Sequence, residues 1–180
     1  MIVPGADTSA LAGILQPDER VIWAGRPDPA ATFRTQLFWW WLGVPVLGIT
    51  VGLRHAGIIS PDISYIALVI AFTFLVAPAV MVAVAYGTTY AITDRRVIIK
   101  YDTVRTRRRL VWYSLETLDK EFEILNSGEN VGHLYFLSGA RSKVPDADYT
   151  GKVAFREVRN PREVASLLES ARKHLQTRPS

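Results

Sequence analysis

The chain has 180 residues, of which 49% are apolar and 21% are charged, and it contains no cysteine. Without cysteine, a disulfide framework and a thiolate metal site are excluded. The formal net charge of +4 is too small to indicate nucleic-acid binding by itself, and we expect no nucleic-acid partner. The charges are segregated, because none falls between Arg34 and Arg54 or between Asp62 and Asp94. This segregation predicts a soluble part joined to a hydrophobic part.

Residues 1–36 predict an N-terminal arm that carries one strand. The first 30 residues contain four acidic residues and no apolar run, so a cleavable signal peptide is not expected. Residues 19–25 read Glu-Arg-Val-Ile-Trp-Ala-Gly and predict a strand that completes a sheet formed later in the chain. Trp23 in this strand is predicted to be buried and to anchor the arm to the soluble domain.

Two uncharged windows predict a transmembrane helical hairpin over residues 37–86. The second window, residues 63–86, is long enough to cross a hydrocarbon core of ~30 Å. The first, about residues 37–56, opens with three consecutive tryptophans typical of a membrane interface, and we expect it to run on towards Ile58 and Ile59. The short linker makes the two helices antiparallel neighbours. The alternative is a pair of buried helices in a soluble core, which so small a domain could hardly enclose.

The basic residues predict the orientation of this hairpin. Three Lys or Arg residues lie in the arm, one lies in the linker, and 17 follow Thr93. Because cytoplasmic segments carry the excess of basic residues, both termini are predicted to be cytoplasmic. The chain is therefore expected to be a multi-pass protein of the bacterial cytoplasmic (inner) membrane, in contact with membrane lipids.

Residues 87–180 predict a β-rich domain that ends in a helix. The turn at Thr93–Arg95 is expected to use the Asp94 side chain as a bond to its own backbone. The final helix is predicted over residues 161–176, with Asn160 as N-cap, Pro161 at the first position and Glu163 completing a capping box. The six predicted strands are Thr88–Ile92, Arg96–Tyr101, Arg108–Ser114, Asp119–Leu125, Gly132–Ser138 and Lys152–Val158.

Three segments of the chain resemble a known family. They are residues 17–27 before the hairpin, residues 90–99 after it, and residues 160–164 at the final helix. In this order they resemble the bacterial pleckstrin-homology-like (PH-like) membrane proteins of the DUF304 type. The resemblance implies a partly closed antiparallel barrel with a C-terminal helix over one end, and no catalytic residues. The positions that carry the signature, for which a structural role is expected, are Trp23, Gly25, Arg26, Pro27, Thr93, Asp94, Arg95 and Arg96.

The expected fold is thus an α+β membrane protein. A two-helix transmembrane hairpin is inserted near the start of a PH-like antiparallel half-barrel, which a C-terminal helix caps. One arginine of the Arg95–Arg96 pair is expected to bond a strand-end carboxylate or the arm that carries Glu19. Trp112 and Tyr113 lie on opposite faces of one strand, so one of them is expected to be exposed and available to a partner.

The sequence offers little for catalysis. His55, His133 and His174 are far apart and none has a partner at the spacing of a zinc site. A nucleophile elbow, a Walker loop and a dinucleotide fingerprint are all missing from the sequence. His133 lies on a predicted strand and is interpreted as a packing residue rather than an acid or base. We therefore predict a protein that is not an enzyme and binds no cofactor.

A basic cluster carries the functional prediction. It consists of Lys100, Arg105, Arg107, Arg108 and Arg109, and the strand order is expected to bring it near the membrane surface. There it would contact anionic headgroups, each basic residue contributing about 1 kcal/mol. The alternative is a solvated turn that keeps a strand edge soluble. The leading hypothesis is a membrane-anchored binding module for a protein partner or anionic headgroups. The second is a structural or assembly subunit of a larger membrane complex.

Overall fold

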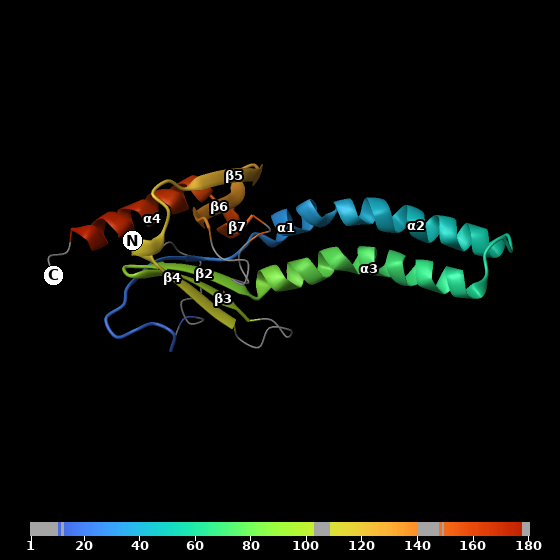
Figure 1. The fold of residues 1–180 in the computed structure, drawn as a ribbon, viewed down its shortest axis with the longest axis horizontal. Coiled ribbons are helices and arrows are strands. Elements are labelled where there is room, and N and C mark those ends of the chain that lie inside the picture. The colour runs from blue at the N-terminus through green and yellow to red at the C-terminus, as the bar shows by residue number, and fades with distance from the viewer. Residues whose placement is uncertain (1–10, 12, 103–108, 140–147, 149, 178–180) are drawn as a thin grey trace. The chain divides into compact units, whose positions relative to one another are not determined.

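The computed structural model describes residues 11, 13–102, 109–139, 148 and 150–177. The chain divides into two compact units. Residues 29–84 form one, called here the helical unit, and residues 1–28 with 85–180 form the other, called the β unit. Within the described residues the protein is α+β, with four α-helices and two antiparallel sheets (Figure 1).

The helical unit contains α1 (Pro29–Gln36), α2 (Phe38–His55) and most of α3 (Pro61–Tyr86). By length and composition, α3 is the one helix of the described chain that could cross a membrane alone. Only 11% of its most apolar stretch is buried, which is unlike the core helix of a soluble protein. The pair α1 and α2 is bent by 47° and reaches the same standard only when counted as one span. A second span therefore stays a prediction.

Helices α2 and α3 touch each other inside the helical unit. At Gly43 an added Cβ would lie 3.1 Å from Cβ of Phe74, a tight contact, so the two helices approach closely at this glycine. Nearby, the Trp39 ring stacks on the Phe74 ring with 5.4 Å between centroids. The indole N–H of Trp40 donates to the carbonyl of Leu75 over 3.1 Å. Glycine and aromatic contacts together fix this pair of helices.

The sequence did not predict a helix over residues 29–36. They form α1, which begins at Pro29 as helices often do. The expectation that the first long helix runs on towards Ile58 and Ile59 is wrong, because it ends at His55. Gly57 adopts a left-handed φ of +68°, and the N–H of Ile58 folds back onto the carbonyl of Leu53. A glycine in this conformation ends a helix.

The β unit holds two antiparallel sheets. The first has the order β1 (Val21–Gly25), β2 (Thr88–Thr93), β3 (Arg96–Tyr101), β4 (Arg109–Ser114). The second has the order β5 (Glu123–Gly128), β6 (Val131–Leu137), β7 (Val153–Arg159). A short 3₁₀ turn, η2 (Leu115–Thr117), leads from one sheet to the other. The predicted arm strand is confirmed, since β1 pairs with β2 although 62 residues separate them along the chain.

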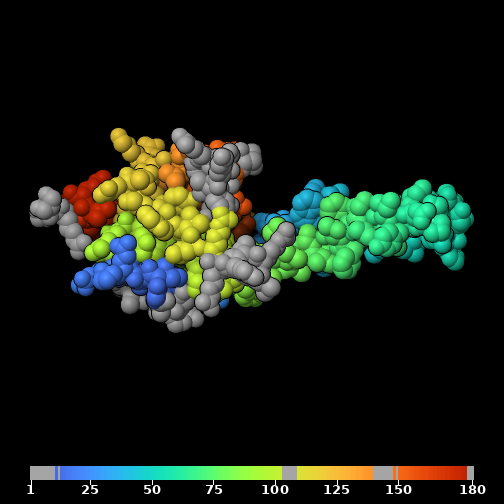
Figure 2. Space-filling model, turned by 60° about the horizontal axis from the view of Figure 1, so that its bottom comes forward, coloured from blue at the N-terminus to red at the C-terminus, as the bar shows by residue number. Residues whose placement is uncertain are grey.

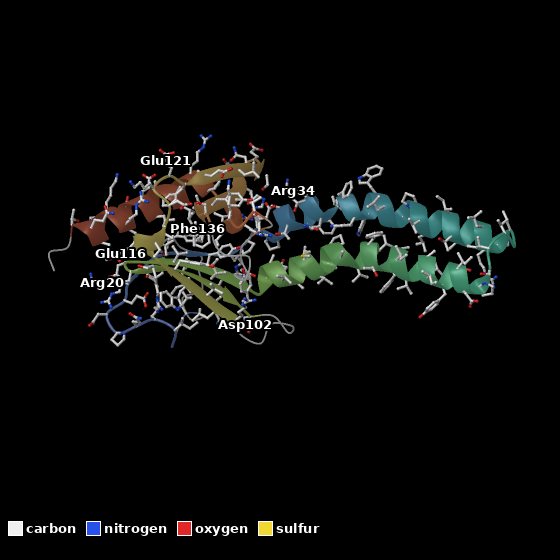
Figure 3. The ribbon with its side chains drawn as sticks, in the orientation of Figure 1. Arg20, Arg34, Asp102, Glu116, Glu121 and Phe136 are labelled. Carbon is white, nitrogen blue, oxygen red and sulfur yellow. The ribbon has the colours of Figure 1, made fainter. Side chains whose placement is uncertain are left out.

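One apolar core joins the two sheets and the C-terminal helix α4 (Pro161–Gln176). Phe136 of β6 is completely buried between the sheets (Figure 3), and its ring lies 5.0 Å from that of Phe155. Trp23 is 9% exposed and packs 5.7 Å from the same Phe155, which confirms its predicted burial. Val164 and Leu168 on α4 complete the core. The arm therefore contributes a large side chain to the centre of the domain.

Five of the six strands predicted after the hydrophobic part agree with β2, β3, β4, β6 and β7 to within one residue at each end. The strand predicted over Asp119–Leu125 is wrong at its start, because β5 begins only at Glu123. Arg172 of α4 donates to the carbonyls of Asp119 and Lys120, which are thereby withdrawn from a strand ladder.

Helix α4 begins at Pro161, as predicted, but the predicted capping box at Asn160 does not form. The backbone of Asn160 is left-handed, with φ of 50°, and its side chain accepts no hydrogen bond from the first turn. Its backbone N–H instead donates to the carbonyl of Asn130 over 2.8 Å, and its side-chain amide donates to Glu163 over 3.4 Å. A capping box needs an extended N-cap backbone, and the bond to Asn130 holds Asn160 in another conformation.

Candidate functional site

Two members of the predicted basic cluster lie in the described chain, Lys100 at the end of β3 and Arg109 at the start of β4. Arg105, Arg107 and Arg108 lie outside the described residues. Strand pairing puts Lys100 opposite Leu110, and Arg109 opposite Tyr101. Lys100 and Arg109 are therefore brought to one end of the first sheet. Lys100 Nζ lies 3.7 Å from Oδ2 of Asp102, so a carboxylate shares this end of the sheet (Figure 3).

This end of the sheet is also where the apolar helix α3 meets the β unit along the chain. α3 ends at Tyr86, and β2 begins at Thr88, which pairs with Tyr101. The N–H of Asp102 donates to the carbonyl of Gly87 over 2.6 Å, which ties the end of β3 to the residue between helix and strand. Strand pairing thus brings the sheet end that holds Lys100 and Arg109 beside Thr88, the second residue after the end of α3.

The opposite end of the sheet holds a buried network that we call the arm junction, made of Glu19, Thr93 and Arg96. Both carboxylate oxygens of Glu19 accept from Arg96, over 2.8 Å from Nε and 2.8 Å from Nη2. The Thr93 hydroxyl donates to the same carboxylate over 2.8 Å. Arg96 also donates to the carbonyl of Ile14 over 3.1 Å. The expectation that an arginine of the Arg95–Arg96 pair bonds the arm at Glu19 is confirmed, with Arg96 in that role.

The hydrogen bonds of the arm junction favour the ionised form of Glu19. Burial alone would raise the pKa of the Glu19 carboxyl, but the hydrogen bonds from Arg96, the Gln16 N–H and Thr93 outweigh burial and hold the pKa below its ordinary value. Thr93, not Asp94, organises the turn, because its hydroxyl accepts the N–H groups of Arg95 and Arg96. The Asp94 carboxylate instead accepts the backbone N–H of Arg20 in the arm over 3.0 Å, which corrects the expected local bond.

Other signature positions also hold the arm. A Cβ at Gly25 would lie 2.5 Å from the ring of Trp23, so that glycine is required for the indole to fold over it. Pro27 is buried, whereas Arg26 and Arg95 are exposed. The arrangement of Trp23, Gly25 and Thr93 with Arg96 indicates that most of the signature fixes the arm to the sheet rather than forming a pocket.

A second polar cluster, which the sequence did not predict, lies across the other sheet. We call it the bulge cluster, made of Ser127, His133 and Glu157. Each of these residues sits at an irregularity of its own strand, β5, β6 or β7. The Ser127 hydroxyl donates to Oε2 of Glu157 over 2.5 Å, and Nε2 of His133 lies 3.7 Å from Oε1. β-Bulges re-aim side chains and are frequent near functional sites.

Glu157 is strained. Its φ is 49°, in the left-handed region that side chains other than glycine seldom adopt, and it is 6% exposed. Its backbone N–H donates to Nδ1 of His133 over 3.3 Å, and its carbonyl accepts the N–H of Asp28 over 2.7 Å. These contacts hold the strained residue. The local sequence gave no sign of the bulge, because no glycine or asparagine occupies position 157.

His133 is half-buried, and burial lowers the pKa of its imidazole; Arg156 acts in the same direction, while the negative charge of Glu157 partly opposes both. Since Nδ1 accepts a backbone N–H, the neutral ring carries its proton on Nε2.

The Ser127 hydroxyl contacts the carboxylate and not the imidazole, so the order of a serine-hydrolase triad is not reproduced. Among the described residues, groups of three His, Cys, Asp or Glu able to hold a metal are not found.

A polar groove of about 430 Å³ lies beside the β5–β6 turn and the first turn of α4. Asn126, Asn130 and Arg162 line it, and all three are exposed. An apolar groove of about 440 Å³ lies on the helical unit, lined by Trp40, Trp41 and Pro45 among others. Lys100 and Arg109, the members of the basic cluster that the structure describes, line neither groove.

No protein-family model, curated protein or solved structure matches the chain. The resemblance to PH-like proteins of the DUF304 type therefore stays a prediction from the three segments that carry it.

Proposed function

We propose that the chain is a membrane-anchored, non-enzymatic binding module of the PH-like DUF304 type. In this proposal, α2 and α3 form a transmembrane hairpin and the β unit lies at the cytoplasmic face of a bacterial inner membrane. The module contacts anionic headgroups or a protein partner there. Three features support the proposal: the apolar helices, the arrangement of the sheets and the position of the basic residues.

The anchor is supported by α3, whose apolar surface is largely exposed, and by the Trp39–Trp41 run at the start of α2. Trp41 is 79% exposed, which suits a side chain at a membrane interface and would be costly in water. The distribution of basic residues, three in the arm, one in the linker and 17 after Thr93, favours cytoplasmic termini. Two antiparallel sheets of four and three strands, with a C-terminal helix packed on their core, agree with what the resemblance implies.

The observation that carries the functional proposal is the register of β2, β3 and β4. It puts Lys100 and Arg109 at the sheet end that follows α3, where Asp102 is bonded to Gly87. If α3 crosses a membrane, this end faces the leaflet at which α3 emerges. Basic side chains at such a surface are attracted to anionic lipids, over a distance of about one Debye length.

The test uses the full chain reconstituted into lipid nanodiscs. Since the protein has no cysteine, Asp102→Cys provides a single site for a fluorescent label. We expect quenching by a headgroup spin label in phosphatidylglycerol nanodiscs, with less quenching in phosphatidylcholine or at high salt. Changing the whole basic cluster to glutamine should reduce the quenching in phosphatidylglycerol.

The matched control changes five exposed basic residues elsewhere on the β unit to glutamine: Arg95, Lys120, Arg156, Arg162 and Lys173. It removes the same charge and should leave the quenching unchanged. Equal quenching in both lipids, in the wild type and in both variants, would contradict the headgroup proposal. The module would then have to act through a protein partner.

A second function, a subunit of a larger membrane complex, is favoured by one observation on α2. Gly43 packs against α3, whereas an added Cβ at Gly48 or Gly52 would meet nothing within 4 Å. Glycines four residues apart allow close approach of another transmembrane helix. Purification in a mild detergent separates the two functions, because a stoichiometric membrane partner supports the subunit and a lone chain with bound anionic lipid supports the module.

A further inference from the structure

The first sheet has an outer face, turned away from the apolar core, that is only partly covered. Residues directly opposite one another on paired strands share a face, so Ala24, Ala91, Ile98 and Trp112 form one row across the four strands. Leu11 covers the first three members of this row, which are buried with it in a small second cluster. At β4 the cover stops, and Trp112 is 55% exposed.

The next row of the same face ends in a second exposed apolar side chain. Leu110 pairs with Lys100, which pairs with Thr89, and Leu110 is 40% exposed. Leu110 and Trp112 therefore stand side by side on β4, the edge strand of the described sheet. Figure 2 shows the yellow residues of this part of the chain at the surface of the β unit. Of Trp112 and Tyr113, it is Trp112 that is exposed, as the prediction required of one of them.

Trp112 is held firmly despite its exposure. The guanidinium carbon of Arg96 lies 5.6 Å from the centre of the indole ring, and Arg96 is itself fixed by both oxygens of Glu19. The arm junction thus supports one side of the ring, while more than half of the side chain stays open to its surroundings. An aromatic ring that is already ordered loses little conformational entropy when it binds.

The position of the two side chains indicates what covers them. Thr89, at the level of Leu110, is two residues past Gly87, about 7 Å along a strand, and Trp112 is one further pleat away. The interfacial layer of one leaflet is about 5–7 Å thick, so Leu110 is within reach of it. For Trp112 to enter the layer as well, this face must incline towards the bilayer, and the experiment below tests that requirement. Lys100 pairs with Leu110 and shares its face, while Arg109 begins the same strand on the other face; both complement an anionic surface at this end of the sheet.

We propose that Leu110 and Trp112 insert into the headgroup layer of an anionic membrane, at the sheet end that carries Lys100 and Arg109. This inference rests on the proposed function and names the second half of the same contact. The basic residues supply attraction that salt screens, whereas the apolar pair supplies contact that salt does not screen. Tryptophan favours the interface because its ring is apolar while its N–H can still bond to headgroups or water.

The test again uses the full chain in phosphatidylglycerol nanodiscs, with Leu110→Cys carrying a polarity-sensitive fluorescent label and Trp112 intact. We expect a blue-shifted emission, with quenching by a lipid that is spin-labelled high on its acyl chain. The quenching should persist at high salt and should fall when Trp112→Gln is added. Leu125→Cys is the matched control, because Leu125 is 54% exposed and lies on β5 of the other sheet; neither effect is expected there.

The inference is overturned if the label at residue 110 is quenched no more than the label at residue 125. A blue shift at residue 110 without lipid quenching overturns it too, since a protein surface would then cover the pair. The Asp102→Cys label separates this failure from failure of the proposed function. Headgroup quenching at residue 102 without acyl quenching at residue 110 removes the inference alone, and quenching at neither site removes both.

Discussion

The arm junction and the bulge cluster each bury one carboxylate in the β unit, but with partners of different chemistry. At the arm junction, Glu19 is paired with a guanidinium, that of Arg96, through both carboxylate oxygens. In the bulge cluster, Glu157 faces His133, an imidazole whose pKa burial lowers. The first arrangement is a fixed clamp for the arm, and the second can respond to protonation.

The backbones differ in the same way. Thr93 and Arg96 flank a turn between two strands, where the Thr93 hydroxyl accepts the backbone N–H groups of Arg95 and Arg96. Glu157 is left-handed at a bulge and is held by His133, Ser127 and Asp28. Strain of about 1–3 kcal/mol at such a residue persists only where its surroundings over-determine it. The Glu19 carboxylate therefore secures the fold through an arginine, whereas the Glu157 carboxylate depends on a strained backbone and a histidine.

The largest expected effect comes from removing the arm altogether. A chain of residues 87–180 alone should lack a native fold, because it loses β1, Trp23 and Glu19 and leaves Arg96 buried without its carboxylate. Residues 1–28 joined to residues 87–180 through a short flexible linker should fold, since Gly25 of β1 pairs with Tyr90 of β2. Dispersion of the amide NMR signals measures both. A well-dispersed spectrum from residues 87–180 would show that the clamp is dispensable.

The second effect is a test of the clamp by a single substitution in the joined β unit. Arg96→Met leaves the Glu19 carboxylate buried and uncompensated, which should cost about 3–5 kcal/mol of unfolding free energy. Arg95→Met is the matched control, one residue away and exposed, and should change the free energy by less than about 0.5 kcal/mol. Urea unfolding measures both.

The double variant Glu19→Gln with Arg96→Met sharpens this test. Removing both charges should recover part of the loss, because a buried pair replaced by neutral groups often costs little. If Arg96→Met is no worse than Arg95→Met, the arm junction is not a clamp and the comparison fails.

The sequence predicted the arm junction better than the bulge cluster, for a physical reason. Strands β2 and β3 pair without a register shift and β1 has one, between Val21 and Trp23. The pairing of the arm, the burial of Trp23 and the bond from Arg96 to Glu19 followed from apolar pattern and charge. The bulge cluster depends on where β5, β6 and β7 slip in register. A slip of one residue moves a side chain to another face and leaves no mark in local composition.

The same contrast explains the other misses. Residues 119–122 alternate like a strand, but Arg172 from α4, more than 50 residues away, takes two of their carbonyls. The capping box at Asn160 failed because Asn130 claims its N–H. In each case a long-range contact overrode a local pattern, whereas the long apolar helix α3 needed only its composition to be predicted.

The smallest effect should come from the pH dependence of the bulge cluster. Burial lowers the pKa of His133 in the folded protein, so the unfolded chain, with an ordinary value near 6.5, binds the proton more readily. The stability that His133 contributes is therefore fully present above about pH 6.5 and is lost progressively as the pH falls from there through the lower pKa of the folded state. The slope for one group is at most about 1.4 kcal/mol per pH unit.

Geometry gives the reason for this sign. A protonated ring would point an N–H from Nδ1 at the N–H of Glu157, which now donates to it over 3.3 Å. The Glu157 carboxylate at 3.7 Å favours the imidazolium, while burial and Arg156 oppose it more strongly. The pKa of Glu19 is lowered as well, so the arm junction keeps its contribution until the pH falls below the ordinary carboxyl value of about 4.5. Between pH 7.5 and about 5 the two clusters should therefore separate, with only the bulge cluster weakening.

Urea unfolding of the joined β unit across this range measures the difference. His133→Asn retains an acceptor near the place of Nδ1 but cannot titrate, so it should flatten the decline in stability between pH 7.5 and about 5. His174→Asn is the matched control, because His174 is exposed on α4 and should leave the decline as it is in the wild type. Equal slopes in the wild type and His133→Asn would mean that the Glu157 bulge is as fixed as the arm junction. The left-handed Glu157 would then be a purely structural feature, held by Ser127 and Asp28 at every pH.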